Sequence, residues 1–290
     1  MERRSDVYRE QKVASQWLSS GAKKRIALIS IPSFYGRGGL GEKEEVSSSS
    51  SEDFQKELLK LTKSSAPLDA LVIDLRGNPG GYLEEAVAIA GFFLGSKPIV
   101  GVKDNSELRI LKSEFNVTPI YTGPLLVAID EETASAGEVL ASALKDYQRA
   151  VLVGAAASFG KGSVQKLFQL NDPFLDLQVN EKTGVMKLTT SVFFSPLGHS
   201  PSNGGVTSHV VLSSATPKKS SPSFYKNQKV AEEQPLLDPG EIEKIRKQEE
   251  NLNSKIAQIE VETESGSVTN NQILKVSDQV VDLVGSTEVN

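Results

Sequence analysis

The sequence contains no cysteine and only two histidines, His199 and His209. The absence of cysteine excludes disulfide bonds, thiolate nucleophiles and zinc sites built on thiolates. Two histidines alone do not make a metal cluster, so we expect neither a metal nor another cofactor. The sequence also lacks any apolar run of about 18 residues, which is the length that a membrane-spanning helix needs.

The first residues, Met1-Glu-Arg-Arg-Ser-Asp6, are basic, but no apolar segment follows them. A secretory signal peptide requires such a segment. We therefore expect either a cytoplasmic protein or a longer precursor whose N-terminus is missing from this sequence.

The chain has 290 residues, of which 38% are hydrophobic, so it can bury a sizeable core in one large domain or two small ones. Its 32 basic and 37 acidic residues give a net charge of −5. Surfaces that bind nucleic acid usually carry an excess of basic residues. We therefore expect proteins or peptides as partners, and no nucleic acid.

Short apolar runs alternate with glycine-rich turns and with segments that repeat apolar residues at helical spacing. Runs that are apolar at nearly every position are typical of strands covered on both faces of a sheet. The order strand, turn, helix occurs twice, which predicts an α/β fold class: a layered core with added β-strands. The predicted strands are residues 26–31, 70–75, 125–129, 150–154, 164–170 and 186–194, with residues 11–18 paired to the first. The predicted helices are residues 51–63, with Ser51 as N-cap, 83–94 and 134–143.

The composition changes after about residue 212, where serine, lysine and proline become frequent. We predict a catalytic core at residues 1–212, a flexible linker at 213–237 and a helical tail at 238–290. Asp238 followed by Pro239 is a typical helix start. An apolar stripe follows it, formed by Ile242, Ile245, Leu252, Ile256 and Ile259. Because the stripe is shorter than three heptads, it favours a helix docked on the protein's own body over an oligomer contact. Residues 273–284 predict a second docking helix.

The sequence matches two known motifs only in part: the phosphate-binding loop of nucleotide-binding proteins and the motifs of penicillin-recognising enzymes. Phe159 and Gly162 stand where a phosphate-binding loop starting at Gly154 requires a glycine and a hydroxyl, which excludes that loop. The sequences Ser158-Phe-Gly-Lys161 and Lys182-Thr-Gly184 match parts of the penicillin-recognising motifs. No Ser-Asp-Asn sequence accompanies them, and the two fragments lie too close together in the chain. We interpret both as chance matches.

Ser135 and Lys161 form a stronger candidate pair. Ser135 lies among small residues at a predicted strand-to-helix turn, where a helix N-terminus helps to bind an oxyanion. Lys161 lies between two glycines, and a lysine that is held neutral can activate a serine hydroxyl. Taken singly, the small residues are equally consistent with tight helix packing, and the lysine with a solvated loop. A triad would instead have to use His199 or His209, which we predict to be surface or loop residues.

Six sequence blocks occur in an order that resembles the carboxyl-terminal processing peptidases, also called tail-specific proteases. The resemblance covers roughly residues 10–212, and an ordered set of blocks is more specific than any single motif. The blocks are Pro32-Ser-Phe-Tyr35, Asp74-Leu-Arg-Gly-Asn-Pro-Gly-Gly81, Thr133-Ala-Ser-Ala-Gly-Glu138, Asp146-Tyr147, Phe159-Gly-Lys-Gly-Ser-Val-Gln165 and Gly205-Val-Thr207.

This resemblance implies a serine endopeptidase with a crotonase/ClpP-like core that acts in the periplasm or cell envelope on proteins with apolar C-terminal tails. It implies that Ser135 is the nucleophile and Lys161 its general base. Gln165 would orient the lysine amine, and Asp146 would have a supporting role. The oxyanion hole implied consists of backbone amides, that of Ala136 together with that of Gly80 or Gly81.

Elementary chemistry agrees with these roles. A lysine with an ordinary pKa of about 10.4 must lose about three units to accept a proton near neutral pH, and burial is the available means. Gln165 can hydrogen-bond to the amine without adding charge, so it favours the neutral form. An aspartate in contact with the amine would raise the lysine pKa, so we expect Asp146 to lie at one remove.

Three features depart from the family pattern that the resemblance implies. Tail-specific proteases usually carry a PDZ domain before the strand at residues 26–31, and about 25 residues are too few for a domain. The segment Ala155-Ala-Ala-Ser158 is one residue longer than the usual loop and lacks its acidic residue. Gly137 stands in place of a common serine. The alternative function is therefore a catalytically idle binding or scaffold protein that keeps the fold.

Overall fold

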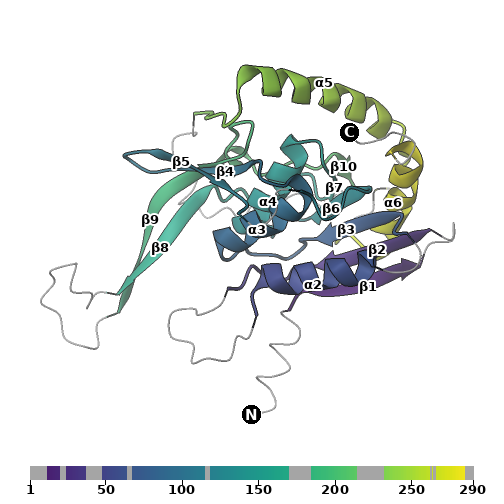
Figure 1. Cartoon of the computed structure of the whole chain (residues 1–290), viewed down its shortest axis with the longest axis horizontal. Coiled ribbons are helices and arrows are strands. Elements are labelled where there is room, and N and C mark those ends of the chain that lie inside the picture. Colours follow the sequence, from purple (N-terminus) through teal and green to yellow (C-terminus); the bar gives the residue numbers. More distant parts are fainter. Residues whose placement is uncertain are drawn as a thin grey trace, which may run out of the picture.

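The structure is a computed structural model that describes residues 12–19, 24–36, 48–63, 67–114, 118–169, 184–213, 232–261, 263 and 266–284. In these residues a six-stranded sheet lies between helices on both of its faces (Figure 1). The predicted α/β class is therefore confirmed.

The main sheet is parallel except at one edge. Its strands, in spatial order, are β1 (Ala14–Ser19), β2 (Arg25–Ser30), β3 (Ala70–Asp74), β6 (Leu125–Ile129), β7 (Val151–Gly154) and β10 (Val210–Val211). The first strand pairs with the second, as predicted, and runs antiparallel to it, while all the other pairs are parallel. The four central strands are the apolar runs of the sequence, and each is almost wholly buried.

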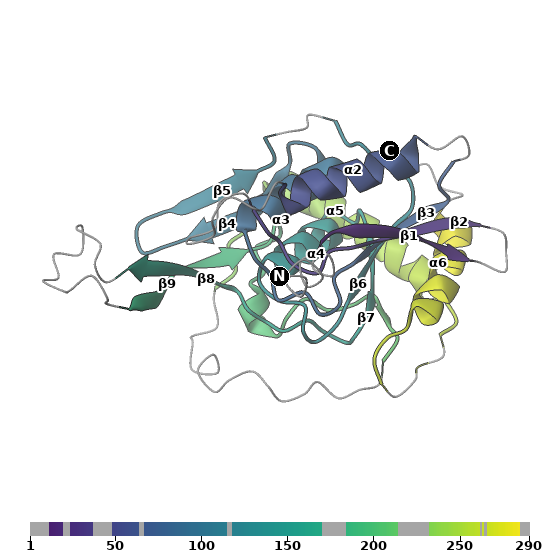
Figure 2. The same cartoon turned by 90° about the horizontal axis from the view of Figure 1, so that it is seen from below.

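Helices cover both faces of this sheet because successive strand residues point to opposite faces. On β3, Leu71 and Ile73 belong to the core beneath α2 (Ser50–Thr62), α3 (Leu83–Leu94) and α4 (Ala136–Asp146). Ala70 and Val72 belong to the core on the opposite face, beneath α6 (Asn270–Val284). Figure 2 shows α6 beside β1 and β2, on the side away from α2.

A second, antiparallel sheet extends from the body. It has the order β5 (Leu108–Lys112), β4 (Pro98–Lys103), β9 (Val185–Phe194), β8 (Ser163–Gln169), and its last two strands reach away from the helices (Figure 1). Strands β8 and β9 were predicted, but β4, β5 and β10 were not. Strand β4 was not predicted because Pro98 and Gly101 are residue types that are rare in strands. Strand β5 was not predicted because it contains charged residues.

Two predicted helix starts were wrong by one or two residues. The N-cap of α2 is Ser49 and not Ser51, because Ser49 and Glu52 form a capping box in which each side chain accepts a hydrogen bond from the other's backbone N–H. Helix α4 begins at Ala136 and not at residue 134, because Ser135 has a non-helical backbone with φ 56° and ψ −116°.

The helices described after residue 232 pack on the body. Helix α5 (Pro239–Ile256) starts as predicted, because the Asp238 carboxylate accepts hydrogen bonds from the N–H groups of Gly240 and Glu241. From its apolar stripe, Leu252 and Ile256 pack against the core beneath α6, which agrees with docking on the protein's own body. Residues 214–231 of the predicted linker lie outside the described residues, and the division into core, linker and tail stays a prediction.

Candidate active site

The candidate site lies where the turns after β3 and β6 meet. The carboxyl ends of neighbouring parallel strands lie at one edge of a sheet, where α/β proteins usually carry their sites. The turn after β3 contains Gly80, and the turn after β6 ends at Ser135. A β-carbon added to Gly80 would lie 2.7 Å from the β-carbon of Ser135, so the two turns are in close contact. The structure thus brings the predicted glycine turn and the predicted nucleophile together.

Ser135 has a strained backbone at the start of a helix. Its φ of 56° lies in a region that L-residues other than glycine rarely adopt, and such a conformation costs about 1–3 kcal/mol. Helix α4 starts at the next residue, so the partial positive charge of the helix N-terminus lies beside the serine. Strained strand-to-helix turns of this kind expose the nucleophilic serine in α/β-hydrolases.

The buried carboxylate of Glu138 connects the serine to the lysine loop. Its Oε2 accepts hydrogen bonds from the backbone N–H groups of Ser135 and Lys161, both at 2.8 Å. Its Oε1 accepts from the Ser158 hydroxyl at 2.6 Å and from the Gly160 N–H at 2.7 Å. One oxygen atom therefore bridges the backbones of the two predicted dyad residues.

Glu138 was not predicted as a site residue. Burial raises the pKa of its carboxyl group, and the four hydrogen bonds act in the opposite direction. The only signal in the sequence is its spacing, since a glutamate three residues after a serine is the pattern of a capping box. That pattern predicts the bond to the Ser135 N–H, but it contains nothing about the lysine loop.

The loop that leads to Lys161 is held by hydrogen bonds at several points. The N–H of Ala155 donates to the Ile129 carbonyl at 3.0 Å, and the N–H of Phe159 donates to the Thr133 carbonyl at 3.0 Å. The Ser158 hydroxyl, besides donating to Glu138, accepts the N–H of Val206 at 2.7 Å. The loop at residues 155–158 is therefore hydrogen-bonded both to the serine turn and to the chain before β10.

Lys161 is half-buried, between glycines that allow close packing. A β-carbon at Gly162 would overlap the hydroxyls of Ser200 and Ser202. Burial lowers the pKa of Lys161, and the neighbouring ammonium of Lys187 lowers it further, while Glu138 acts against both. The net direction is the one that a lysine base requires.

The other predicted residues lie in distinct places. Asp146 is the last residue of α4, at the opposite end of that helix from Ser135, and its buried carboxylate accepts the N–H of Leu197 at 2.8 Å. Burial raises the pKa of Asp146, against hydrogen bonds that lower it. Gln165 lies in β8 opposite Thr189 of β9. The contact of Gln165 with the lysine amine stays a prediction.

Asn78 organises the glycine turn from within. Its side-chain amide donates to the Ile31 carbonyl at 2.6 Å, and its side-chain oxygen accepts the N–H of Gly80 at 2.7 Å. Its backbone carbonyl accepts the N–H of Ala134 at 2.9 Å, next to the nucleophile. The N–H of Gly80 is therefore already bound by Asn78, a role that sequence reasoning missed.

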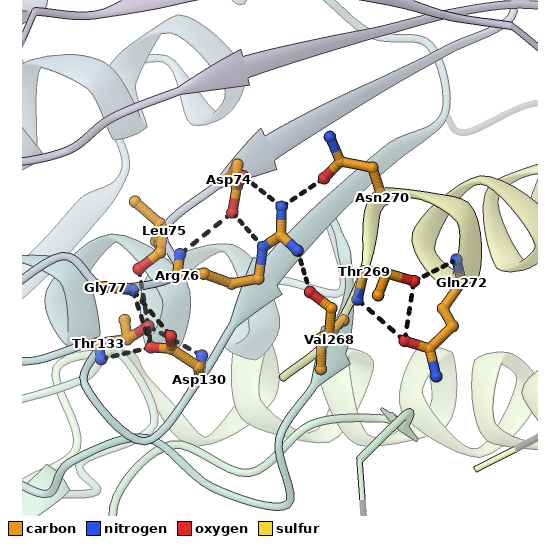
Figure 3. A network of polar contacts seen from close by, with 10 residues as sticks. All are labelled: Asp74, Leu75, Arg76, Gly77, Asp130, Thr133, Val268, Thr269, Asn270 and Gln272. Atoms are coloured by element: carbon orange, nitrogen blue, oxygen red, sulfur yellow. Dashed lines mark hydrogen bonds and ion pairs between the residues drawn. The ribbon is translucent and has the colours of Figure 1, made fainter. Parts of the chain in front are cut away.

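Asp130 also connects the turn after β3 to the turn before Ser135 (Figure 3). Its carboxylate accepts the N–H of Gly77 at 2.9 Å and the N–H of Thr133 at 2.9 Å. The Thr133 hydroxyl donates to the carbonyl of Leu75 at 2.8 Å. The turn after β3 and the turn before Ser135 are thus one hydrogen-bonded unit.

Both histidines interact elsewhere. The Nδ1 atom of His199, an exposed residue, lies 3.3 Å from a Glu233 carboxylate oxygen. His209 lies in the loop before β10, where its Nδ1 accepts the N–H of Leu152 at 2.9 Å. Burial lowers the pKa of His209 to about 4. Both lie in loops, as the sequence predicted.

Among the described residues, no three histidine, cysteine, aspartate or glutamate side chains are grouped so that they could bind a metal ion. Within the same part of the chain, no helix has the length and apolar character needed to cross a membrane.

Known proteins resemble this chain in sequence. The model of peptidase family S41 matches residues 25–212. A tail-specific protease of Haemophilus influenzae is 36% identical over 207 residues, which are 71% of this chain and 27% of that protein. A carboxy-terminal-processing protease of Bartonella bacilliformis is 33% identical over 165 residues, 56% of this chain and 36% of that protein. The chain therefore spans about a third or less of the length of these relatives.

Solved structures resemble it in fold. A photosystem II D1 C-terminal processing protease superposes with a TM-score of 0.54 at 27% identity, over 69% of this chain and 48% of that one. A lipoprotein from Streptococcus agalactiae, 18% identical, superposes with a TM-score of 0.53 over 77% of this chain and 72% of that one. At that identity the second likeness concerns the fold alone.

Proposed function

Because the chain belongs to peptidase family S41, we propose that it is a serine endopeptidase that hydrolyses protein substrates with Ser135 as nucleophile and Lys161 as general base. Relatives of this chain are proteases named for processing carboxyl termini. The dyad, the preference for apolar tails and a location in the cell envelope belong to the proposal.

The observation that carries this proposal is the joint geometry of Ser135 and Glu138. Ser135 has a strained backbone at the N-terminus of α4, and Glu138 binds the backbone of Ser135 and that of Lys161 through one oxygen atom. Strain of this size persists only where surrounding contacts hold it, and it is concentrated at functional sites. A plain helix start would need neither the strained serine nor the buried carboxylate.

The reaction then proceeds through an acyl-enzyme. Neutral Lys161 takes the proton of the Ser135 hydroxyl as Oγ attacks the carbonyl carbon of the scissile bond. The resulting ammonium gives that proton to the leaving nitrogen as the carbon–nitrogen bond breaks, which leaves an ester on Ser135. Lys161 then takes a proton from water, the hydroxide attacks the ester, and the proton returns to Ser135.

We propose the N–H groups of Ala136 and Gly81 as the oxyanion hole. Ala136 is the first residue of α4, so its N–H lies at the positive end of the helix. Between the two predicted glycines, Gly81 is favoured because the N–H of Gly80 is bound by Asn78. Two amide donors held in place before the reaction stabilise the developing charge at little cost.

An open cleft next to this turn is the proposed place for substrate side chains. It has a volume of about 650 Å³ and begins at Tyr82, the residue after Gly81. Ala88 and Phe92 provide apolar surface, and Glu52 and Glu84 are among the acidic residues that also line it. The apolar part supports binding of an apolar substrate tail.

Hydrolysis of casein by the purified chain tests this function. We expect the wild type to cleave casein and both Ser135→Ala and Lys161→Ala to lose nearly all activity, while His199→Ala keeps it. If the folded wild type is no faster than Ser135→Ala, the proposed function is wrong and the idle scaffold is favoured. If activity survives Lys161→Ala but not His199→Ala, the base is wrongly assigned.

A further inference from the structure

The side chain of Arg76 connects the glycine turn after β3 to the start of α6. Its guanidinium pairs with Asp74 at the end of β3, with Nε 2.7 Å from Oδ1 and Nη2 2.6 Å from Oδ2 (Figure 3). The same group donates through Nη1 to the carbonyl of Val268 and through Nη2 to the Asn270 side-chain oxygen, the latter at 2.6 Å. Val268 lies two residues before α6, and Asn270 is the first residue of that helix.

The partners of Arg76 in the C-terminal segment are fixed in place. Thr269 and Gln272 cap the start of α6, since the Gln272 side-chain oxygen accepts the Thr269 N–H at 2.9 Å and the Thr269 hydroxyl accepts the Gln272 N–H at 3.3 Å. The Gln272 amide donates to the Leu212 carbonyl at 3.1 Å. Ile273 and Val276 are buried beneath the main sheet. The Val268 carbonyl is therefore presented by a packed element.

On its other side, Arg76 is directly followed by the turn of the candidate site. The N–H of Gly77 donates to Asp130, which also holds Thr133, two residues before Ser135. Gly77, Gly80 and Gly81 all have positive φ. Glycines carry little intrinsic preference for one conformation, so this turn depends on contacts from outside to keep its shape.

We propose that residues 266–284 are a positioning element of the active site, which acts through Arg76 on the glycine turn and so on the oxyanion-binding amides. This inference rests on the proposed function for its catalytic part. The segment lies beyond residues 25–212, the part that the family model matches. Small displacements of catalytic groups have large effects on rate. A glycine turn that Arg76 no longer holds in place should therefore lower kcat.

Variants of the full chain test the proposal. Arg76→Lys keeps the charge but loses the planar fork that reaches Asp74, Val268 and Asn270 at once. Asn270→Ala removes the side-chain oxygen that accepts a hydrogen bond from Nη2, and it leaves Arg76 and the Val268 carbonyl in place. Asp282→Ala is the matched control, because it removes an α6 contact to Lys24 at the far end of the same helix.

Two readouts are measured on each variant. Hydrogen exchange of the backbone amides in residues 76–82 reports the turn without any need for activity. We expect faster exchange there in both test variants, and wild-type exchange in the control. Steady-state hydrolysis of a casein-derived peptide should show kcat reduced about tenfold in Arg76→Lys, with KM changed less than about twofold.

The double variant Arg76→Lys/Asn270→Ala should have the kcat of Arg76→Lys, since both changes break the same connection. Unchanged exchange in both test variants, or faster exchange with wild-type kcat, would overturn the positioning role. A wild type without activity would instead contradict the proposed function, and the exchange data would still decide whether α6 fixes the turn.

Discussion

A carboxylate that accepts four hydrogen bonds is poorly replaced by its amide, because an amide offers one oxygen and presents two N–H donors. At Glu138 all four partners are donors. We therefore expect Glu138→Gln to lower the free energy of unfolding by about 3 kcal/mol, as for a broken buried polar network, and to abolish activity. Urea denaturation measures the first effect. Glu132→Gln, on the exposed surface nearby, is the control, and an equal loss in the two variants would contradict the role of Glu138.

The pH dependence of activity reports the Lys161 amine. The amine accepts a proton only when neutral, so kcat/KM should rise with pH through the Lys161 pKa, which burial and Lys187 lower from the ordinary value of lysine. Removing the charge in Lys187→Gln takes away one of the two causes and so raises that pKa. We expect the acidic limb of the profile to move to higher pH. Lys247→Gln on α5 is the matched control, and a limb that stays in place or moves to lower pH would argue against Lys161 as base.

The proposed nucleophile and base are candidates that the sequence alone offers at the residue scale, whereas the groups that bind their backbones were not predicted. Ser135 and Lys161 lie in short motifs that a linear sequence displays. Glu138 and Asn78 act through contacts between turns that are distant in the chain, such as the bond from Asn78 to the Ile31 carbonyl. No residue type or local spacing reveals such a partner before the strands are ordered in a sheet.

Among the structural elements, the glycine turn has positions that differ in their tolerance of a side chain. Gly77 and Gly80 both have positive φ, but a β-carbon at Gly77 would meet nothing within 4 Å, whereas one at Gly80 would overlap Ser135. Gly77→Ala should therefore cost only the backbone strain of about 1 kcal/mol. Gly80→Ala should cost more and should also displace Ser135, with a far larger loss of kcat. Thermal unfolding and casein hydrolysis of the pair check this, and equal effects in both variants would be inconsistent with the contact.

Elements with continuous apolar runs or clear helical spacing were predicted almost to the residue, as for α3 and β6. The buried positions of such elements are visible in the sequence as apolar residues at strand or helix spacing. Strand β4 was missed because its pairing with β9 and β5, and not its composition, makes it a strand. The start of α4 was misplaced because Ser135 has a non-helical backbone, which the local helix propensity does not reveal.

At the scale of the whole molecule, α6 packs on the main sheet, in agreement with the docking helix predicted at residues 273–284. Ile273 is fully buried against strands of the main sheet. We expect Ile273→Ala to lower the free energy of unfolding by about 2–4 kcal/mol, in one transition seen equally by circular dichroism and by fluorescence of Trp17, the one tryptophan of the sequence. Asn271→Ala, exposed on the same helix, should have little effect. Two separate transitions would show that the C-terminal helices unfold independently of the sheet.

Covalent labelling of Ser135 tests the central claim most directly. The folded chain is treated with a fluorophosphonate, digested, and analysed by mass spectrometry. The account predicts an adduct on Ser135 in the wild type and in His199→Ala, and labelling at least about a hundredfold slower in Lys161→Ala, where the base is missing. Labelling of a different residue, or wild-type labelling of Ser135 in Lys161→Ala, would contradict it.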